Sequence, residues 1–131
     1  MSGCTRRQVL FYLGGIAITG FVSEIATDCT TSQRVIDAVN MLFERPGTRE
    51  SAARIGREYL RIYPSQKSVS ALSRSLDSLA PPRLTDTNRS GLTKIYADLI
   101  AEDFASVNLV NVDGWVLSKT EARVFGLLAL T

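Results

Sequence analysis

The feature that most constrains this chain is an apolar run close to its start, at residues 9–22. Three glycines and Thr19 are the only interruptions in the run, and Arg6 and Arg7 stand shortly before it. A helix on the surface of a soluble domain carries polar side chains at regular intervals, and this run does not. As a helix it would span about 21 Å, whereas the hydrocarbon core of a bilayer is roughly 30 Å thick. That length is typical of the apolar part of an export signal, which we place at residues 1–28.

The residues around the arginine pair resemble the twin-arginine translocation signal, in which two arginines precede a moderately apolar segment. The matching residues are Thr5, Arg6, Arg7, Val9 and Leu10, and Val9 stands where phenylalanine is commoner. The resemblance implies export by the twin-arginine machinery of an already folded protein, alone or with a bound partner. Its destination would be the periplasm, or the periplasmic face of the inner membrane. The residues alone leave open an ordinary secretory signal, an uncleaved anchor, or a buried N-terminal helix.

Cleavage of the leader is a separate question. A cleaved signal ends in small residues spaced as Ala-x-Ala, and residues 21–29 contain no good example. A membrane tether through residues 9–26 is therefore an alternative to a cleaved signal. Cys29 stands where a lipoprotein cysteine could follow the signal, but Asp28 before it occupies a place that favours a small residue.

The remainder, residues 29–131, predicts one small all-α domain. Apolar positions recur every three or four residues in five stretches, so we expect a bundle of about five helices behind the apolar signal helix. Prolines and a Pro-Gly pair separate several of these stretches. We expect the helix over 87–106 to be central, because it is the longest and best patterned. In chain order, the expected helices lie within residues 32–45, 48–63, 69–79, 87–106 and 118–130.

A change of period marks residues 108–117, which alternate between apolar and polar types and are rich in β-branched side chains. Asp113-Gly114 is a turn signal, so this stretch predicts a short β-hairpin or an extended loop. Two strands alone are marginally stable, so the hairpin must pack on the helices or on another protein. Ser118 and Glu121 have the spacing of a capping box, which predicts the start of the last helix.

Composition excludes several classes of function. The chain has 15 basic and 13 acidic residues, a net charge of +2, and lacks the clustered basic face of a nucleic-acid-binding protein. It has no histidine and two cysteines, which removes the usual general base and the usual zinc ligands. No phosphate-binding loop, calcium loop or hydrolase elbow occurs. We therefore assign no catalytic residue, metal ligand or cofactor.

Two groups of charged residues resemble functional sites, and we interpret both as ordinary solvent-exposed charges. Asp98, Glu102 and Asp103 are interpreted as a solvated helix face rather than as catalytic carboxylates. The arginines of the second helix, at positions 54, 57 and 61, are interpreted in the same way, paired with neighbouring glutamates. An enzyme that uses only carboxylates, tyrosines or serines is the third and least supported interpretation of the chain.

The candidate binding residues lie near the C-terminus. Trp115 is the only tryptophan, and tryptophan is enriched at binding hot spots. The alternative is that Trp115 fills the core where the hairpin meets the helix over 87–106. The stretch 124–130 carries no charge, so it is either buried on all sides or offers an apolar face to a partner. The candidate partner-binding residues are Trp115, Val124, Phe125 and Leu128.

A twin-arginine leader on a small helical body resembles the small subunits that accompany exported oxidoreductases, such as flavin-dependent gluconate or sugar dehydrogenases. The leader carries this resemblance, and the body shares only general layout and size. The resemblance implies a non-catalytic accessory subunit that supplies the export signal to a larger enzyme, and it transfers no catalytic residue. The alternative is a standalone exported or membrane-tethered helical protein that binds a ligand, a lipid or a component of the cell envelope.

Overall fold

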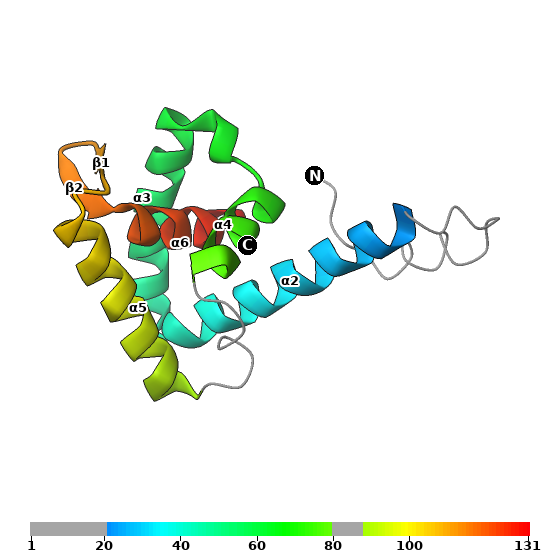
Figure 1. The fold of residues 1–131 in the computed structure, drawn as a ribbon. Coiled ribbons are helices and arrows are strands. Elements are labelled where there is room, and N and C mark those ends of the chain that lie inside the picture. Colours follow the sequence, from blue (N-terminus) through cyan, green and yellow to red (C-terminus); the bar gives the residue numbers. More distant parts are fainter. Residues whose placement is uncertain (1–20, 80–87) are drawn as a thin grey trace.

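The computed structural model describes the backbone of residues 21–79 and 88–131, and the side chains of this part from residue 29 onward (Figure 1). The expected twin-arginine motif and most of the apolar run lie outside these residues. So does most of the possible tether through 9–26. No helix in the described ranges is long and apolar enough to cross a membrane.

The described residues form a mostly helical fold with one β-hairpin, which confirms the expected fold class at this level. A 3₁₀ turn, Pro64–Gln66, connects the second and third helices. The hairpin precedes the last helix and consists of β1 (Leu109–Val112) and β2 (Trp115–Ser118). The helices are α2 (Phe21–Leu42), α3 (Pro46–Ile62), α4 (Val69–Leu79), α5 (Arg89–Ala105) and α6 (Lys119–Leu130).

Two helix starts differ from the expected ones. α2 spans Phe21–Leu42 and so passes through Ser32, where the first helix was expected to begin, because residues 21–42 contain no proline or glycine that would stop a helix. α3 begins at Pro46, although Pro46-Gly47 was expected only to separate two helices. Proline is favoured in the first turn because its missing N–H has no partner there in any case.

The hairpin and the capping box are confirmed. β1 and β2 pair antiparallel, with Val112 opposite Trp115. Asp113 and Gly114 form the turn with φ of 50° and 84°, which matches the right-handed twist of the two strands. At the start of α6, Ser118 Oγ accepts a hydrogen bond from the N–H of Glu121, and the Glu121 carboxylate accepts one from the N–H of Ser118, both at 3.0 Å.

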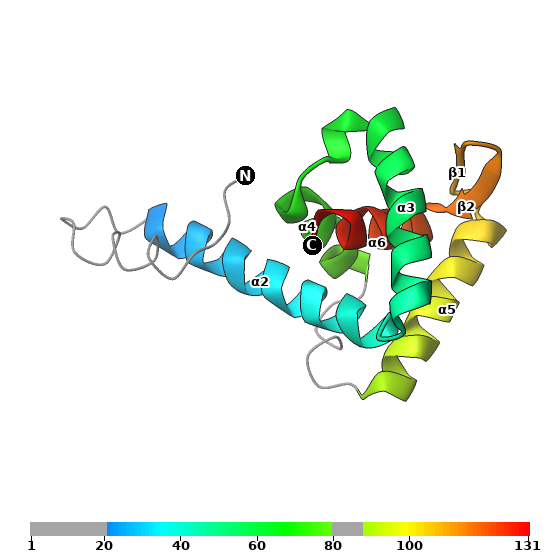
Figure 2. The same ribbon diagram turned by 180° about the vertical axis from the view of Figure 1, so that it is seen from behind.

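The central element is α6, not α5 as expected from the sequence. α6 packs against α3, α4 and α5, and also contacts α2 and the hairpin (Figures 1 and 2). α5 lies at the outside and buries only Leu92 and Asp103. Leu127 and Leu128 of α6 are buried at the centre of the core. The buried core side chains around them come from every other helix except α5, and include Val35, Val39, Tyr59, Leu60, Leu72 and Leu76.

Two glycines allow α6 to reach this position. A Cβ atom on Gly56 of α3 would lie 1.9 Å from the carbonyl oxygen of Phe125 and 2.8 Å from the nitrogen of Gly126. A Cβ on Gly126 would lie 3.2 Å from the ring of Tyr59 and 3.3 Å from a methyl carbon of Leu72. The backbones of α3 and α6 are therefore in direct contact at Gly56, with no room for a side chain between them.

We predict that Gly56→Ala destabilises the domain by at least about 3 kcal/mol, because the added methyl group meets backbone atoms that cannot rotate away. Chemical denaturation followed by circular dichroism measures the loss. The matched control is Gly47→Ala in the first turn of the same helix, where an added Cβ meets nothing within 4 Å. A Gly56→Ala protein as stable as the Gly47→Ala protein would refute the close contact.

Candidate partner-docking surface

The C-terminal end of α5 has an unusual residue at its last turn. The N–H of Asn108 donates to the carbonyl of Asp103 at 2.8 Å, and that of Val107 donates to the carbonyl of Phe104 at 3.3 Å. This pattern places Val107 at the left-handed position that commonly follows a helix, and its φ is 55°. Glycine is the usual residue there, because a Cβ makes the left-handed conformation unfavourable.

A buried carboxylate joins the end of α5 to the start of α6. Asp103 is 7% exposed, and its Oδ2 accepts a hydrogen bond from the N–H of Thr120 at 2.8 Å. Its Oδ1 accepts from the side-chain amide of Asn108 at 2.9 Å, and the N–H of Lys119 donates to the Asn108 carbonyl at 3.1 Å. Asp103 is therefore not part of the solvated face expected from the sequence, although Asp98 and Glu102 are exposed.

The environment of Asp103 favours its charged form. Burial raises the pKa of its carboxyl group, but hydrogen bonds from Thr120, Asn108 and Ser118 lower it more, so the pKa falls below 3.8. The carboxylate also lies at the N-terminus of α6, where the helix dipole favours negative charge. Asp103 is accordingly ionised at neutral pH and stabilises the junction between the two helices.

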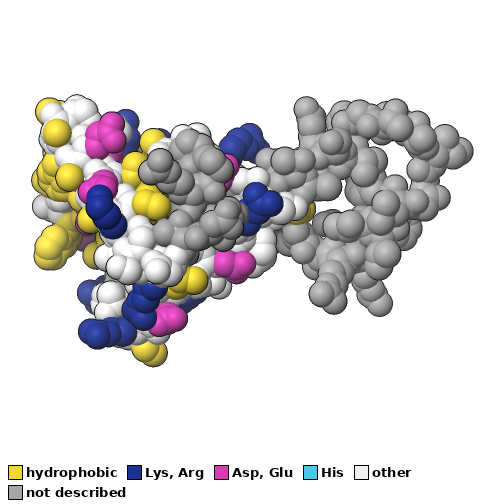
Figure 3. Space-filling model, turned by 60° about the horizontal axis from the view of Figure 1, so that its bottom comes forward, with side chains coloured by type: hydrophobic (Ala, Val, Ile, Leu, Met, Phe, Trp, Pro, Cys, Tyr) yellow, Lys and Arg dark blue, Asp and Glu magenta, His cyan; other side chains and the backbone are white. Residues whose placement is uncertain are grey.

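Four large apolar side chains are exposed at this junction, and we call them the hairpin-end patch. Trp115 is 66% exposed and Val107 is 77% exposed, while Phe104 and Val116 are 47% and 56% exposed. α5 contacts β2, so both sources of the patch lie at the same end of the molecule. Trp115 and Val116 are successive residues of β2, so they lie on opposite faces of the hairpin. Hydrophobic side chains reach the surface at this end, on the left of Figure 3.

The exposure of Trp115 shows that its interpretation as a core residue is wrong. Val110, Val112 and Leu117 of the hairpin are buried and fill that part of the core. Trp115 stands opposite Val112 at the last pair before the turn, and its side chain extends beyond the edge of the core into solvent.

The other three candidate partner-binding residues lie elsewhere. Val124 and Leu128 are buried in the protein's own core, and Phe125 packs edge-to-face against Phe43 with ring centroids 6.0 Å apart. Burial thus accounts for the missing charge in the second half of α6. Of the four candidates, only Trp115 has most of its side chain at the surface.

Sequence reasoning missed Phe104, Val107 and Val116. Val116 could have been found, because the alternation of the hairpin places it on the face opposite Val110 and Val112. Phe104 has the spacing of the apolar side chains of its helix but lies in the last turn, beyond the part of α5 that packs on the core. No local signal identifies Val107 as left-handed, because that depends on where α5 ends.

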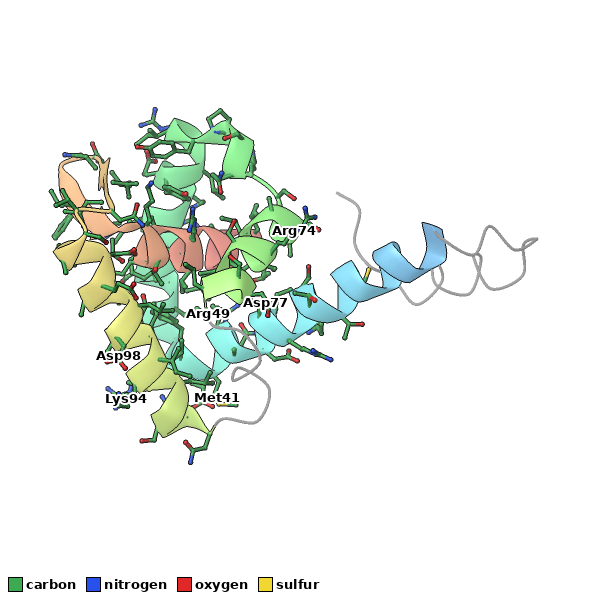
Figure 4. All side chains as sticks on the ribbon, in the orientation of Figure 1. Met41, Arg49, Arg74, Asp77, Lys94 and Asp98 are labelled. Atoms are coloured by element: carbon green, nitrogen blue, oxygen red, sulfur yellow. The ribbon has the colours of Figure 1, made fainter. Side chains whose placement is uncertain are left out.

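Charged side chains elsewhere on the described surface form ordinary ion pairs. Arg61 pairs with Glu58 at 2.8 Å on α3, and Lys94 pairs with Asp98 at 2.8 Å on α5 (Figure 4). Arg54 and Arg57 are exposed on the same helix as Arg61. Such solvated pairs contribute about 0–1 kcal/mol each and indicate a surface in water rather than a site.

The apolar hollow between the described helices is too small for a small-molecule ligand of ordinary size. An apolar cavity of about 40 Å³ lies between α2, α4, α5 and α6, lined in part by Val35, Leu76 and Leu92. Ligand pockets usually enclose about 300–1,000 Å³. Among residues 21–79 and 88–131, no three His, Cys, Asp or Glu side chains are grouped so as to hold a metal ion.

Comparison with known proteins adds no relative. No family model matches the sequence, and no curated protein and no solved structure is significantly similar to it. The hairpin-end patch holds the four most exposed large apolar side chains in the described residues, and we take it as the candidate binding surface.

We predict that Asp103→Asn lowers the free energy of unfolding at pH 7 by about 1.5–3 kcal/mol, because the buried donors around it lose a charged acceptor. The deficit relative to the wild type should be fully present well above pH 3.8, where the carboxyl group is ionised in both the folded and the unfolded wild type. It should shrink as the pH falls below 3.8 and vanish once the pH has passed the lowered pKa of the native carboxyl group, because the wild-type side chain is then protonated as well. Denaturation at a series of pH values measures both effects.

The control is Asp98→Asn on the exposed face of the same helix, which should change stability by less than about 1 kcal/mol. An Asp103→Asn deficit that does not shrink in acid would show that the charge of Asp103 has no part in the junction.

Proposed function

We propose that this protein is a non-catalytic accessory subunit that supplies a twin-arginine export signal to a larger, exported oxidoreductase and docks on it through the hairpin-end patch. The observation that carries the proposal is Trp115, a tryptophan that is 66% exposed and stands among three other exposed apolar side chains. Exposed apolar groups of this kind mark contact sites, and tryptophan is enriched among the residues that dominate binding energy.

The leader supports the same role. Thr5, Arg6, Arg7, Val9 and Leu10 match the twin-arginine pattern, and that pathway carries proteins that are already folded. A subunit that binds a folded enzyme before export would take the enzyme across with it. The complex would reside in the periplasm, or at the inner membrane if residues 9–26 remain attached as a tether.

The domain architecture is compatible with an escort role. Its core closes around α6, and four of the eight large apolar side chains that are exposed in the described residues lie at the hairpin end. The alternative proposal is a standalone exported or membrane-tethered helical protein that binds a component of the envelope. It differs from the escort role in requiring no stoichiometric enzyme partner.

We predict that tagged full-length protein, isolated from its native host, carries a large oxidoreductase in equal amount. With Arg6→Lys/Arg7→Lys, both proteins should remain in the cytoplasm, because the twin-arginine pathway requires the arginine pair. Mass spectrometry of the isolated complex and cell fractionation measure the two effects. A protein that is recovered alone and exported with both lysines would instead support the standalone role on an ordinary signal.

A further inference from the structure

We propose that the hairpin-end patch inserts into a concave, apolar cleft on the partner protein, with Trp115 as the inserted side chain. Val107 contributes to the same contact, although its backbone conformation lowers the stability of the free domain. This inference rests on the proposed function, since the partner is taken to be the larger subunit. It adds the shape and chemistry of the surface that the partner must present.

The first step concerns the backbone of Val107. A β-branched residue with φ of 55° is in a conformation that glycine adopts freely and valine does not. The hydrogen bonds around it, from Val107 to Phe104 and from Asn108 to Asp103, are made by backbone atoms alone. Glycine at this position would therefore keep the same helix end and relieve the strain.

The second step concerns the side chain of Val107. It has the largest exposed fraction of any large hydrophobic side chain in the described residues, at 77%. Its methyl groups thus stabilise the free domain very little, while its Cβ destabilises the backbone. Both properties are explained if a second molecule covers the side chain, because sites of local strain are retained where they serve binding.

The third step concerns shape. Residues 113–116, which include the turn, are all exposed, and the hairpin forms a corner of the molecule (Figure 1). A protruding corner is complementary to a concave surface. Its four exposed large side chains are apolar and lie on both faces of the hairpin, so the walls of that concave surface must be apolar. Asp113 is exposed at the turn, so the floor of the cleft must offer it a polar or basic group.

The same shape argues against a second copy of this chain as the occupant. We estimate that the four side chains expose roughly 400 Å², whereas a stable interface buries about 800 Å² from each partner. In a dimer, two protruding hairpins would meet tip to tip and could bury little surface beyond these four side chains of each copy. A cleft would also enclose the strands on either side of the turn and so reach the larger area.

The position of the patch argues against a membrane as the occupant. α2, which connects the body to the leader, extends from the side opposite the hairpin (Figures 1 and 2). A bilayer or translocation machinery that contacts the start of α2 therefore meets the far side of the molecule. The patch stays accessible to a protein partner at the same time.

The test compares Val107→Gly and Trp115→Ala in the full-length protein with Met41→Ala. Met41 is 37% exposed at the end of α2, next to the start of α5 and away from the hairpin (Figure 4). Trp115→Ala should weaken binding to the co-isolated large subunit by at least about 30-fold. Val107→Gly should weaken it about 5-fold or more and yet raise the melting temperature of the free protein by about 4 °C. Met41→Ala should leave the affinity unchanged.

Because Trp115 is the only tryptophan, its fluorescence reports on the patch directly. A blue shift of its emission on addition of the large subunit is expected. If the large subunit binds both variants as tightly as wild type, the cleft is overturned while the escort role stands. If Trp115→Ala abolishes binding but both proteins are exported with Arg6→Lys/Arg7→Lys, the cleft stands and twin-arginine export fails.

Three further outcomes overturn the inference. One is a dimer of the purified protein, seen by sedimentation velocity, that dissociates with Trp115→Ala. Another is a blue shift of Trp115 on phosphatidylcholine–phosphatidylglycerol vesicles that equals the shift on the partner. The last is a Val107→Gly protein that is no more stable than wild type, because Val107 would then be under no strain.

Discussion

The contact between the backbone of Gly56 and the carbonyl of Phe125 determines the arrangement of the rest of the domain. Because Gly56 has no Cβ, α3 and α6 approach each other backbone to backbone, and α6 sinks between the other helices. Its side chains, among them Leu127 and Leu128, then become the centre of the core. A side chain at Gly56 would push α6 outward and expose the apolar half of a helix that carries no charge from residue 124 to its end.

The position of α6 in turn fixes the hairpin. The segment between α5 and α6 is held at its start by the backbone hydrogen bonds at Val107 and at its end by the capping box of Ser118 and Glu121. Asp103 connects the two ends by binding both Asn108 and Thr120. A hairpin held in this way loses little conformational freedom when a partner covers it, and such preorganisation strengthens binding without any additional contact.

The sequence predicted correctly those elements that are determined by residues close together in the chain. Asp113-Gly114 between alternating residues predicted the hairpin, and Ser118 with Glu121 predicted the start of α6. The choice of α5 as the central helix was wrong because Ile95, Tyr96 and Leu99 form as regular an apolar stripe as any in α6. Which helix becomes central depends on the pairing of Gly56 with Gly126, 70 positions apart in the sequence. Asp103 was misplaced for the same reason, since its partner Thr120 belongs to another helix.

The two ends of the molecule differ in what they offer. At one end, α2 leaves the body toward the leader, and at the other the hairpin presents Trp115 and Val107 to solvent. In the proposed escort role this separation has a consequence for the order of events. Because the described start of α2 and the patch lie at opposite ends of the molecule, a partner on the patch would leave the start of α2 accessible to an export machinery. A patch beside α2 would instead make binding and export compete, and a pathway that carries folded complexes requires that they do not.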